Sequence, residues 1–140
     1  MIKRQSIEWD RFLRRSLKEL LSHPPIKFAE MTPSMLPQVP GVYLITKLGR
    51  GTETPYYIGR TKNIKERLYR RHLNGPLESA QLKKYLIDNQ ECSTIEEAKE
   101  FILRHCAARW IEESDYRIRG AIEGYCTAVL FPPYGIEEEH

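Results

Sequence analysis

The sequence lacks a long apolar run and contains little cysteine. No apolar run approaches the ~18 residues of a membrane-spanning helix, and the charged N-terminus lacks the apolar core and cleavage site of a secretory signal. The cysteines, Cys92, Cys106 and Cys126, are isolated, odd in number and without metal-ligand spacing. These absences argue against a membrane protein and against zinc or cysteine chemistry. They favour buried thiols in a reducing cytoplasm.

What remains has the composition of one soluble domain. The chain has 140 residues, of which 41% are hydrophobic and 29% charged, so it can bury a core and is not expected to be disordered. Residues 1–75 carry 15 Lys and Arg against 6 Asp and Glu, a net charge of +9, whereas residues 76–140 carry 7 against 13, a net charge of −6. A basic half suits a polyanion, although a generic mixed surface explains the same charges.

The N-terminal part predicts a helix over residues 6–22, with Ser6 as its N-cap, because apolar residues recur at three- and four-residue steps. The apolar positions are Trp9, Phe12, Leu13, Leu17, Leu20 and Leu21. The basic side opposite them either tracks a phosphate backbone or is simply solvated, and the solvated interpretation is favoured. Five prolines within residues 24–40 then predict an irregular, stiff connector. We interpret residues 1–36 as a helical extension packed on a domain of residues 37–140.

Residues 41–72 hold the most informative pattern. Strands are predicted at 41–46 and 55–58, joined by a glycine-containing turn, so an antiparallel hairpin is the simplest connection. Alternation along the strands puts Tyr43 and Tyr57 on one face, where they can share a site. The other face is expected to hold Val42, Leu44, Tyr56 and Ile58.

A basic helix is expected to follow this hairpin. Gly59 should end the second strand, and Asn63, with a glutamate three residues later, resembles a capping box that begins a helix over 64–73. The start of this helix, beside Arg60 and Lys62, is a natural anion site. Arg67 and Arg71 share one stripe farther along the helix.

Three more helices and one strand complete the prediction. The helices are expected at 79–89, 94–104 and 116–130, and the strand at 105–111. Ser93 should cap the second of these helices, and Ser114 or Asp115 the last one.

The tyrosines and arginines suit a phosphodiester substrate. Its hydrolysis requires a positioned nucleophile, a proton acceptor and charge neutralisation, usually by a divalent cation. A phenol has an ordinary pKa near ~10, so as a base it needs nearby cations to lower that pKa. Arg60, Arg67 and Arg71 are expected to supply them and to bind phosphate oxygens. The competing interpretation is that the tyrosines pack in the core and the arginines are solvated.

Gly41-Val42-Tyr43, then Tyr57-Ile58-Gly59, then Arg67 closely resemble the motif of the GIY-YIG nuclease family, over roughly residues 38–135. The resemblance implies an α/β fold with a small three-stranded antiparallel sheet flanked by helices. It also implies DNA cleavage with one divalent cation, Mg²⁺ or Mn²⁺, held by a single glutamate on a later helix. DNA is then the expected partner, with branched or damaged DNA among the candidates. A homodimer or a protein partner is a candidate source of specificity.

The resemblance gives each matching residue a role. Tyr43 would be the general base or orient the water, Tyr57 would bind the phosphate or position the water, and Arg67 would stabilise the phosphate in the transition state. Glu123, on the last predicted helix, would bind the metal. Without the resemblance, Glu123 is better explained as a surface ion pair with Arg119 four residues earlier.

Two positions depart from the family pattern. Relatives carry histidine or tyrosine four residues after the helix arginine, where this sequence has Arg71 followed by His72. On a regular helix His72 joins the stripe of Ile64 and Leu68, so it is either a core or capping residue, or a catalytic residue at a distorted helix end. Gly135 stands where relatives have an asparagine. This keeps open a catalytically weak or inactive nucleic-acid-binding module, and beyond it a structural protein with core tyrosines.

Overall fold

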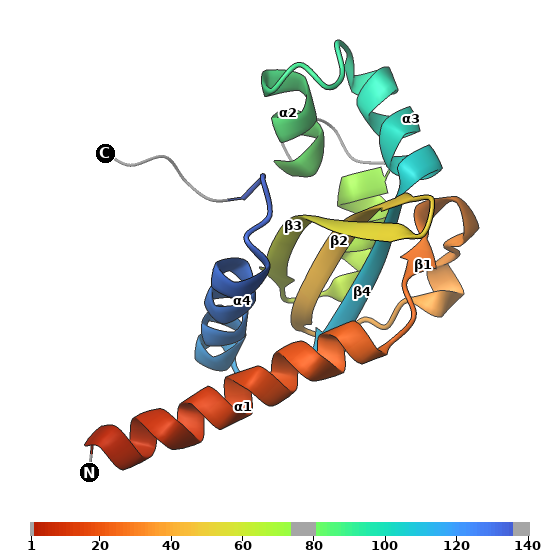
Figure 1. The fold of residues 1–140 in the computed structure, drawn as a ribbon. Coiled ribbons are helices and arrows are strands. Elements are labelled where there is room, and N and C mark those ends of the chain that lie inside the picture. Colours follow the sequence, from red (N-terminus) through yellow and green to blue (C-terminus); the bar gives the residue numbers. More distant parts are fainter. Residues whose placement is uncertain (1, 74–80, 136–140) are drawn as a thin grey trace.

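The computed structural model describes the backbone of residues 2–73 and 81–135, and the side chains of residues 3–70 and 81–135. The elements follow in the order α1 Ile2–Ser22, β1 Ile26–Lys27, η1 Phe28–Glu30, η2 Pro33–Met35, β2 Gly41–Gly49, β3 Thr52–Thr61, η3 Glu66–Leu73, α2 Gln81–Asp88, α3 Ile95–His105, β4 Cys106–Glu112 and α4 Tyr116–Leu130. Figure 1 shows α1 running along the sheet and past it at its N-terminal end, with α4 beside β3. No helix in the described ranges is long and apolar enough to cross a membrane.

The α/β class, with an antiparallel sheet flanked by helices, is confirmed, but the predicted number of strands is wrong. In the described part of the chain the sheet has four strands, in the order β1-β4-β2-β3. The additional strand β1 pairs Ile26 with Ala108 and Lys27 with Ala107. Two residues are too few to show an alternating pattern, and the prolines around them indicated an irregular connector.

The antiparallel hairpin of β2 and β3 is confirmed, and both strands are longer than predicted. Its turn consists of Arg50 and Gly51 alone, and Gly51 has a φ of +66°, which residues with a side chain rarely adopt. Gly59 does not end β3, as was predicted, but pairs with Tyr43 inside the ladder. The tight turn lets pairing extend over residues that the sequence assigned to a loop.

The two faces of the sheet are covered by different helices. One face packs against α1 and α4, through Leu17, Leu20, Val42, Leu44, Ile58, Ile111, Ile122 and Cys126. The other face, which carries Tyr43 and Ile45, packs against η3, α2 and α3. Tyr57 lies against this second cluster, so the two tyrosines share a face as predicted.

A bulge moves Tyr56 to the face opposite the predicted one. Ile45 pairs with Tyr57, but the next residue, Thr46, pairs with Pro55, so Tyr56 is left over between two ladder pairs. Its ring therefore joins the cluster that contains Tyr43. Strict alternation fails here because an extra residue has been inserted into the strand.

The helix α1 begins at Ile2, before the predicted N-cap Ser6. Leu17 and Leu20 are buried against the sheet as expected, whereas Trp9 is 47% exposed and lines a cavity with residues of the first half of α4. The division into residues 1–36 and residues 37–140 stays a prediction.

The other helix ends agree closely with prediction. Helix α4 has the predicted bounds, and the Asp115 carboxylate accepts hydrogen bonds from two N–H groups of its first turn. Helix α3 begins one residue late, because Thr94 rather than Ser93 is the cap and accepts a hydrogen bond from the Glu97 N–H at 3.1 Å. Strand β4 is shifted by one residue, and helix α2 is described only from Gln81. The three cysteines are buried and unbridged, as predicted.

Candidate active site

Helix α4 and the segment after it cover the outer edge of β3. The carboxylate of Glu123 accepts a hydrogen bond from the backbone N–H of Arg60, and the Tyr134 N–H donates to the Tyr56 carbonyl at 3.3 Å. An outer strand leaves alternate backbone groups unpaired by the sheet, and these two contacts use them. A carboxylate from α4 is thereby brought to the end of β3, next to the hairpin tyrosines.

Glu123 is half-buried beside a positive charge. Burial raises the pKa of its carboxyl, while the charge and the backbone N–H of Arg60 act to lower it. The guanidinium of Arg60 lies against Gly120, less than one helical turn before Glu123, where a methyl group on position 120 would overlap it. The small residue at 120 therefore makes room for the cation beside this carboxylate.

The alternative partner of Glu123 is engaged elsewhere. The Arg119 guanidinium donates to the carbonyl oxygens of Glu113 at 3.1 Å and Ser114 at 2.8 Å. Within the described ranges, no ion pair joins Arg119 to Glu123. The interpretation of Glu123 as a simple i,i+4 surface pair is therefore wrong.

Tyr43 and Tyr57 form a hydrogen-bonded pair of phenols. Their ring centroids are 6.1 Å apart, and their hydroxyl groups share a hydrogen bond. Arg67 and Glu123 both act electrostatically on the two phenols. One small region therefore contains the phenols, an arginine from η3 and the carboxylate from α4.

The arginines were expected to lower the pKa values of the two tyrosines, but the net shift of both values is upward. Burial raises the pKa of Tyr43 well above its ordinary value, the negative charge that Tyr57 can carry raises it further, and Arg67 only opposes this. The pKa of Tyr57 is also raised, first by burial and then by Tyr85. Both phenols therefore keep their protons at neutral pH. The sequence indicated the cations but not how deeply the rings are buried.

A basic cavity of about 470 Å³ adjoins these residues. It is lined by Arg60, Thr61, Lys62, Asn63, Glu66, Arg67, Tyr116 and Arg119. Four of these side chains are cationic and only Glu66 is acidic, so the cavity attracts anions. Arg60 and Arg67 belong both to the cavity and to the region around Tyr43 and Glu123.

The predicted anion site at the start of the helix is not available through the backbone. The N–H of Ile64 donates to the Val39 carbonyl at 2.9 Å, and that of Lys65 donates to the Pro37 carbonyl at 3.1 Å. The next N–H donates to the side chain of Asn63 at 3.1 Å, as the predicted cap requires. An anion in this cavity must therefore be bound by side chains.

The predicted helix after Asn63 is present, but its winding differs. From Glu66 to Leu73 it is a π-helix, a form that is rare and often found at functional sites. The 3.6-residue stripe that joined His72 to Ile64 and Leu68 does not apply to it, although both of these apolar residues are fully buried. The side chains of Arg71 and His72 lie outside the described residues.

Gly135 lies against the ring of Tyr57. Its φ is +93°, and a methyl group on it would be 3.2 Å from two ring carbons of Tyr57. The preceding residue, Tyr134, is buried and donates from its hydroxyl to the Glu91 carboxylate, which also accepts from Tyr56 at 3.0 Å. A side chain at position 135 would therefore be strained by the positive φ and would press on the Tyr57 ring.

The donor set of the site suits a hard cation with few protein ligands. No group of three or more His, Cys, Asp or Glu residues gathers anywhere in the described ranges, so none of them builds a site of the structural zinc type. Mg²⁺ is commonly held by one or two carboxylates, with waters and substrate phosphates completing its shell. Glu123 fits that pattern as a single carboxylate beside a phosphate-attracting cavity.

No family model and no curated protein matches the chain, but solved structures do. The GIY-YIG N-terminal endonuclease domain of UvrC from Thermotoga maritima, bound to magnesium, is 27% identical with a TM-score of 0.47, over 74% of this chain and 91% of that one. A tyrosine-to-phenylalanine mutant of the same domain, bound to its catalytic divalent cation, is 26% identical with a TM-score of 0.46, over 75% and 91%. The resemblance is to GIY-YIG domains. With TM-scores below 0.5, what this site does must be decided from its own residues.

All six candidate residues whose side chains the structure describes are brought together. These are Tyr43, Tyr57, Arg60, Lys62, Arg67 and Glu123. Tyr116, the first residue of α4, also lines the cavity, and no motif in the sequence indicated it. Arg119 was considered only as an ion-pair partner, although it too lines the cavity.

Proposed function

We propose that this chain is a metal-dependent endonuclease that hydrolyses phosphodiester bonds in DNA. The observation that carries the proposal is the approach of Glu123, from α4, to the tyrosine pair and Arg67 on the far-removed β2–β3–η3 segment. A half-buried carboxylate, paired phenols and an arginine next to a basic cavity are the groups that phosphodiester hydrolysis requires.

The phenols act as hydrogen-bonding groups in this proposal. Because their pKa values are raised, neither is ionised when no metal ion and no substrate are bound. Tyr43 holds Tyr57 in place through their shared hydrogen bond, and Tyr57 orients the attacking water or a phosphate oxygen. Of the two roles that the family resemblance implies for Tyr43, positioning therefore fits better than action as a phenolate base.

The cationic side chains of the site have two roles: some bind the phosphate, and one orients the carboxylate of Glu123. Arg67 stabilises the charge that develops on the phosphate, since its planar guanidinium matches two phosphate oxygens. Arg60 orients Glu123 through its backbone N–H, and Lys62 adds charge to the cavity. Glu123 would hold a divalent cation, Mg²⁺ or Mn²⁺, which would supply Lewis-acid stabilisation of the phosphate.

The test is the nicking of supercoiled plasmid by the purified chain in Mg²⁺, Mn²⁺ or EDTA. We expect nicking only with a divalent cation, and its loss in Glu123→Gln. Glu112→Gln is the matched control, because Glu112 is an exposed carboxylate at the end of β4. No cutting by wild type of either the plasmid or a duplex with a single-stranded gap, or equal cutting by both variants, would exclude the proposal.

A nucleic-acid-binding module that does not cut is the second candidate function. Gly135 favours it, because the residue that lies against Tyr57 cannot provide the side-chain amide that relatives have there. This alternative predicts salt-sensitive DNA binding without cleavage in any divalent cation. Metal-dependent nicking would exclude it.

A further inference from the structure

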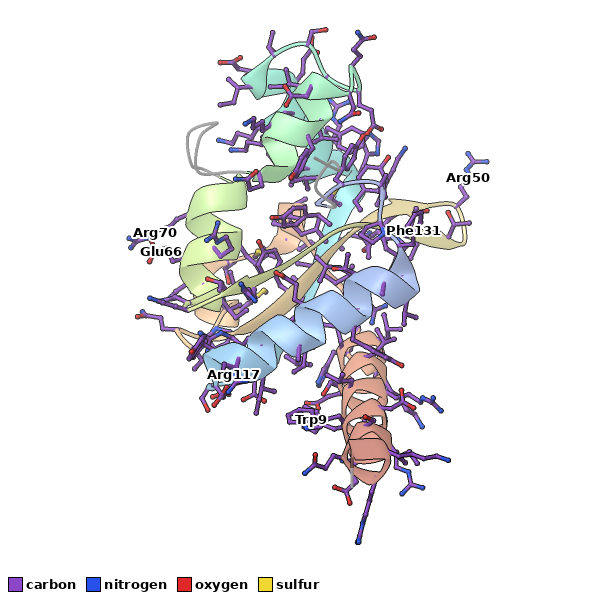
Figure 2. All side chains as sticks on the ribbon, turned by 90° about the vertical axis from the view of Figure 1, so that its left-hand side faces the viewer. Trp9, Arg50, Glu66, Arg70, Arg117 and Phe131 are labelled. Carbon is purple, nitrogen blue, oxygen red and sulfur yellow. The ribbon has the colours of Figure 1, made fainter. Side chains whose placement is uncertain are left out.

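Two exposed aromatic rings line neighbouring parts of the surface at the start of α4, one in the basic cavity and one in a second cavity. Tyr116, the first residue of α4, is 71% exposed and lines the cavity together with Arg60 and Lys62. Its neighbour Arg117 lines a second cavity, of about 420 Å³, between α1 and α4, and Trp9 lines this cavity too. Figure 2 shows Trp9 and Arg117 near the start of α4, whereas Phe131 lies at its other end. The two cavities are therefore linked by consecutive residues of one helix.

The aromatic rings are available for contact and partly fixed in place. Trp9 is 47% exposed, and its ring meets that of Phe12 edge-on, with centroids 5.5 Å apart at 86°. Leu13 and Ile118 also line the second cavity, so one side of it is apolar. A flat ring held beside an apolar wall offers a stacking surface without a large ordering cost.

The charges next to these rings suit a polyanion. Within the described ranges, no ion pair engages Lys62, Arg67 or Arg117. The carboxylate of Asp115 lines the second cavity, but it accepts two backbone hydrogen bonds as the cap of α4. Cations alternating with aromatic rings along a surface are typical of proteins that bind unpaired nucleic acid strands.

We propose that Tyr116 and Trp9 stack on unpaired bases whose phosphates are held by the basic cavity, so that this site takes DNA with a single-stranded segment beside the cleaved bond. The proposal rests on the proposed function in taking DNA as the ligand. A continuous duplex does not meet the requirement, because its base faces are covered by their neighbours. Only an unpaired nucleotide presents a face to an aromatic ring.

The first test compares binding of a fluorescein-labelled thymidine oligonucleotide with binding of a blunt duplex, by fluorescence anisotropy in EDTA. Tyr116→Ala should weaken binding of the single strand about tenfold, within the range measured for base stacking on aromatic residues. Duplex binding should hardly change, and Tyr116→Phe should bind like wild type because it keeps the ring. Phe131→Ala is the matched control, since Phe131 is a 76% exposed aromatic at the other end of α4. An equal loss on both ligands, or no loss, overturns the proposal.

The second test observes Trp9 directly. Trp110→Phe leaves Trp9 as the sole tryptophan of the chain. Its fluorescence should be quenched when the thymidine oligonucleotide binds and should change little with the duplex. Absence of quenching overturns the role of Trp9, even if a variant at Tyr116 were to fold poorly.

The two proposals fail in different ways. If wild type nicks plasmid but shows no single-strand effect at Tyr116 or Trp9, the further inference is wrong and the nuclease stands. If the single strand binds and quenches as described while nothing is cut, the nuclease is wrong and the stacking site stands.

Discussion

Gly59 pairs with Tyr43 across the β2–β3 ladder, and the Tyr43 ring occupies the space above Gly59. A methyl group at position 59 would be 2.5 Å from Cζ and 2.9 Å from Cε1 of that ring. Gly41 is required for a different reason, since a side chain there would meet the Ile111 carbonyl on β4. The two motif glycines are therefore required by different neighbours. Gly59 leaves the space that the ring of Tyr43 fills, and so it determines where this candidate site residue lies.

Gly59→Ala should therefore destabilise the fold and displace Tyr43. We expect a loss of about 1–3 kcal/mol, as for an overpacked core, measured by urea unfolding, together with reduced nicking. Gly124→Ala is the control, because nothing lies within 4 Å of a methyl group at that helical position. It should stabilise the fold by about 0.5–1 kcal/mol. Equal stability of wild type and Gly59→Ala would contradict the packing described above.

Tyr43→Phe should keep the fold and lose cleavage. The ring still fills the space above Gly59, while the hydrogen bond that positions Tyr57 disappears, so we expect nicking to fall by up to about 10²-fold, the cost of a misplaced group in an active site. Tyr125→Phe, on the far side of the sheet, should nick normally. Normal nicking by Tyr43→Phe would instead support the interpretation of Tyr43 as a packing residue.

Acid should weaken the contact that ties the hairpin to the end of α1. The Arg109 guanidinium donates to both carboxylate oxygens of Glu53, at 2.7 and 3.0 Å, and to the carbonyl oxygens of Leu21 and His23. The hydrogen bond from Arg109 is the main cause that lowers the pKa of Glu53, so its stabilisation is complete above the ordinary glutamate range and is lost as the pH falls through the lowered value. Urea unfolding at pH 7 and below pH 4 should show a larger drop for wild type than for Glu53→Gln, by about 0.5–1 kcal/mol, because Glu53 is exposed and solvent screens the pair. Parallel curves for the two proteins would contradict this.

Lys62 should strengthen the binding of DNA of any sequence, through its positive charge. Lys62→Ala should weaken DNA binding and reduce the slope of log K against log salt by about one, the value expected for one phosphate contact. Lys99→Ala, an exposed lysine on α3, should leave the slope unchanged. The measurement is anisotropy over a series of salt concentrations, and an unchanged slope for Lys62→Ala would remove Lys62 from the phosphate site.

The features that could be predicted from the sequence are those that depend on neighbouring residues, such as helix caps and the alternation of side chains along a strand. The cap at Asp115 and the apolar spacing after it predicted both ends of α4, and alternation put Tyr43 and Tyr57 on one face. The prediction was wrong for Tyr56, because a bulge breaks the alternation there. It also missed β1, which is a strand only because it pairs with β4.

The residues of the candidate site could be predicted from the sequence, but their burial and the resulting pKa shifts could not. The motif indicated the tyrosines, Arg67 and Glu123, but burial, which decides the direction of the phenol pKa shifts, depends on packing by several distant elements. The contact of Glu123 with the Arg60 N–H likewise requires that β3 be an outer strand. No local pattern around position 123 contains that information.

The central claim is that Glu123 completes the site by holding a divalent cation beside Tyr57 and Arg60. The direct measurement is anomalous scattering from crystals soaked in Mn²⁺. We predict one manganese site at the Glu123 carboxylate, as its sole protein carboxylate ligand, and no peak there in Glu123→Gln. A wild-type crystal without manganese at Glu123, or with the ion bound at other carboxylates, would contradict the account.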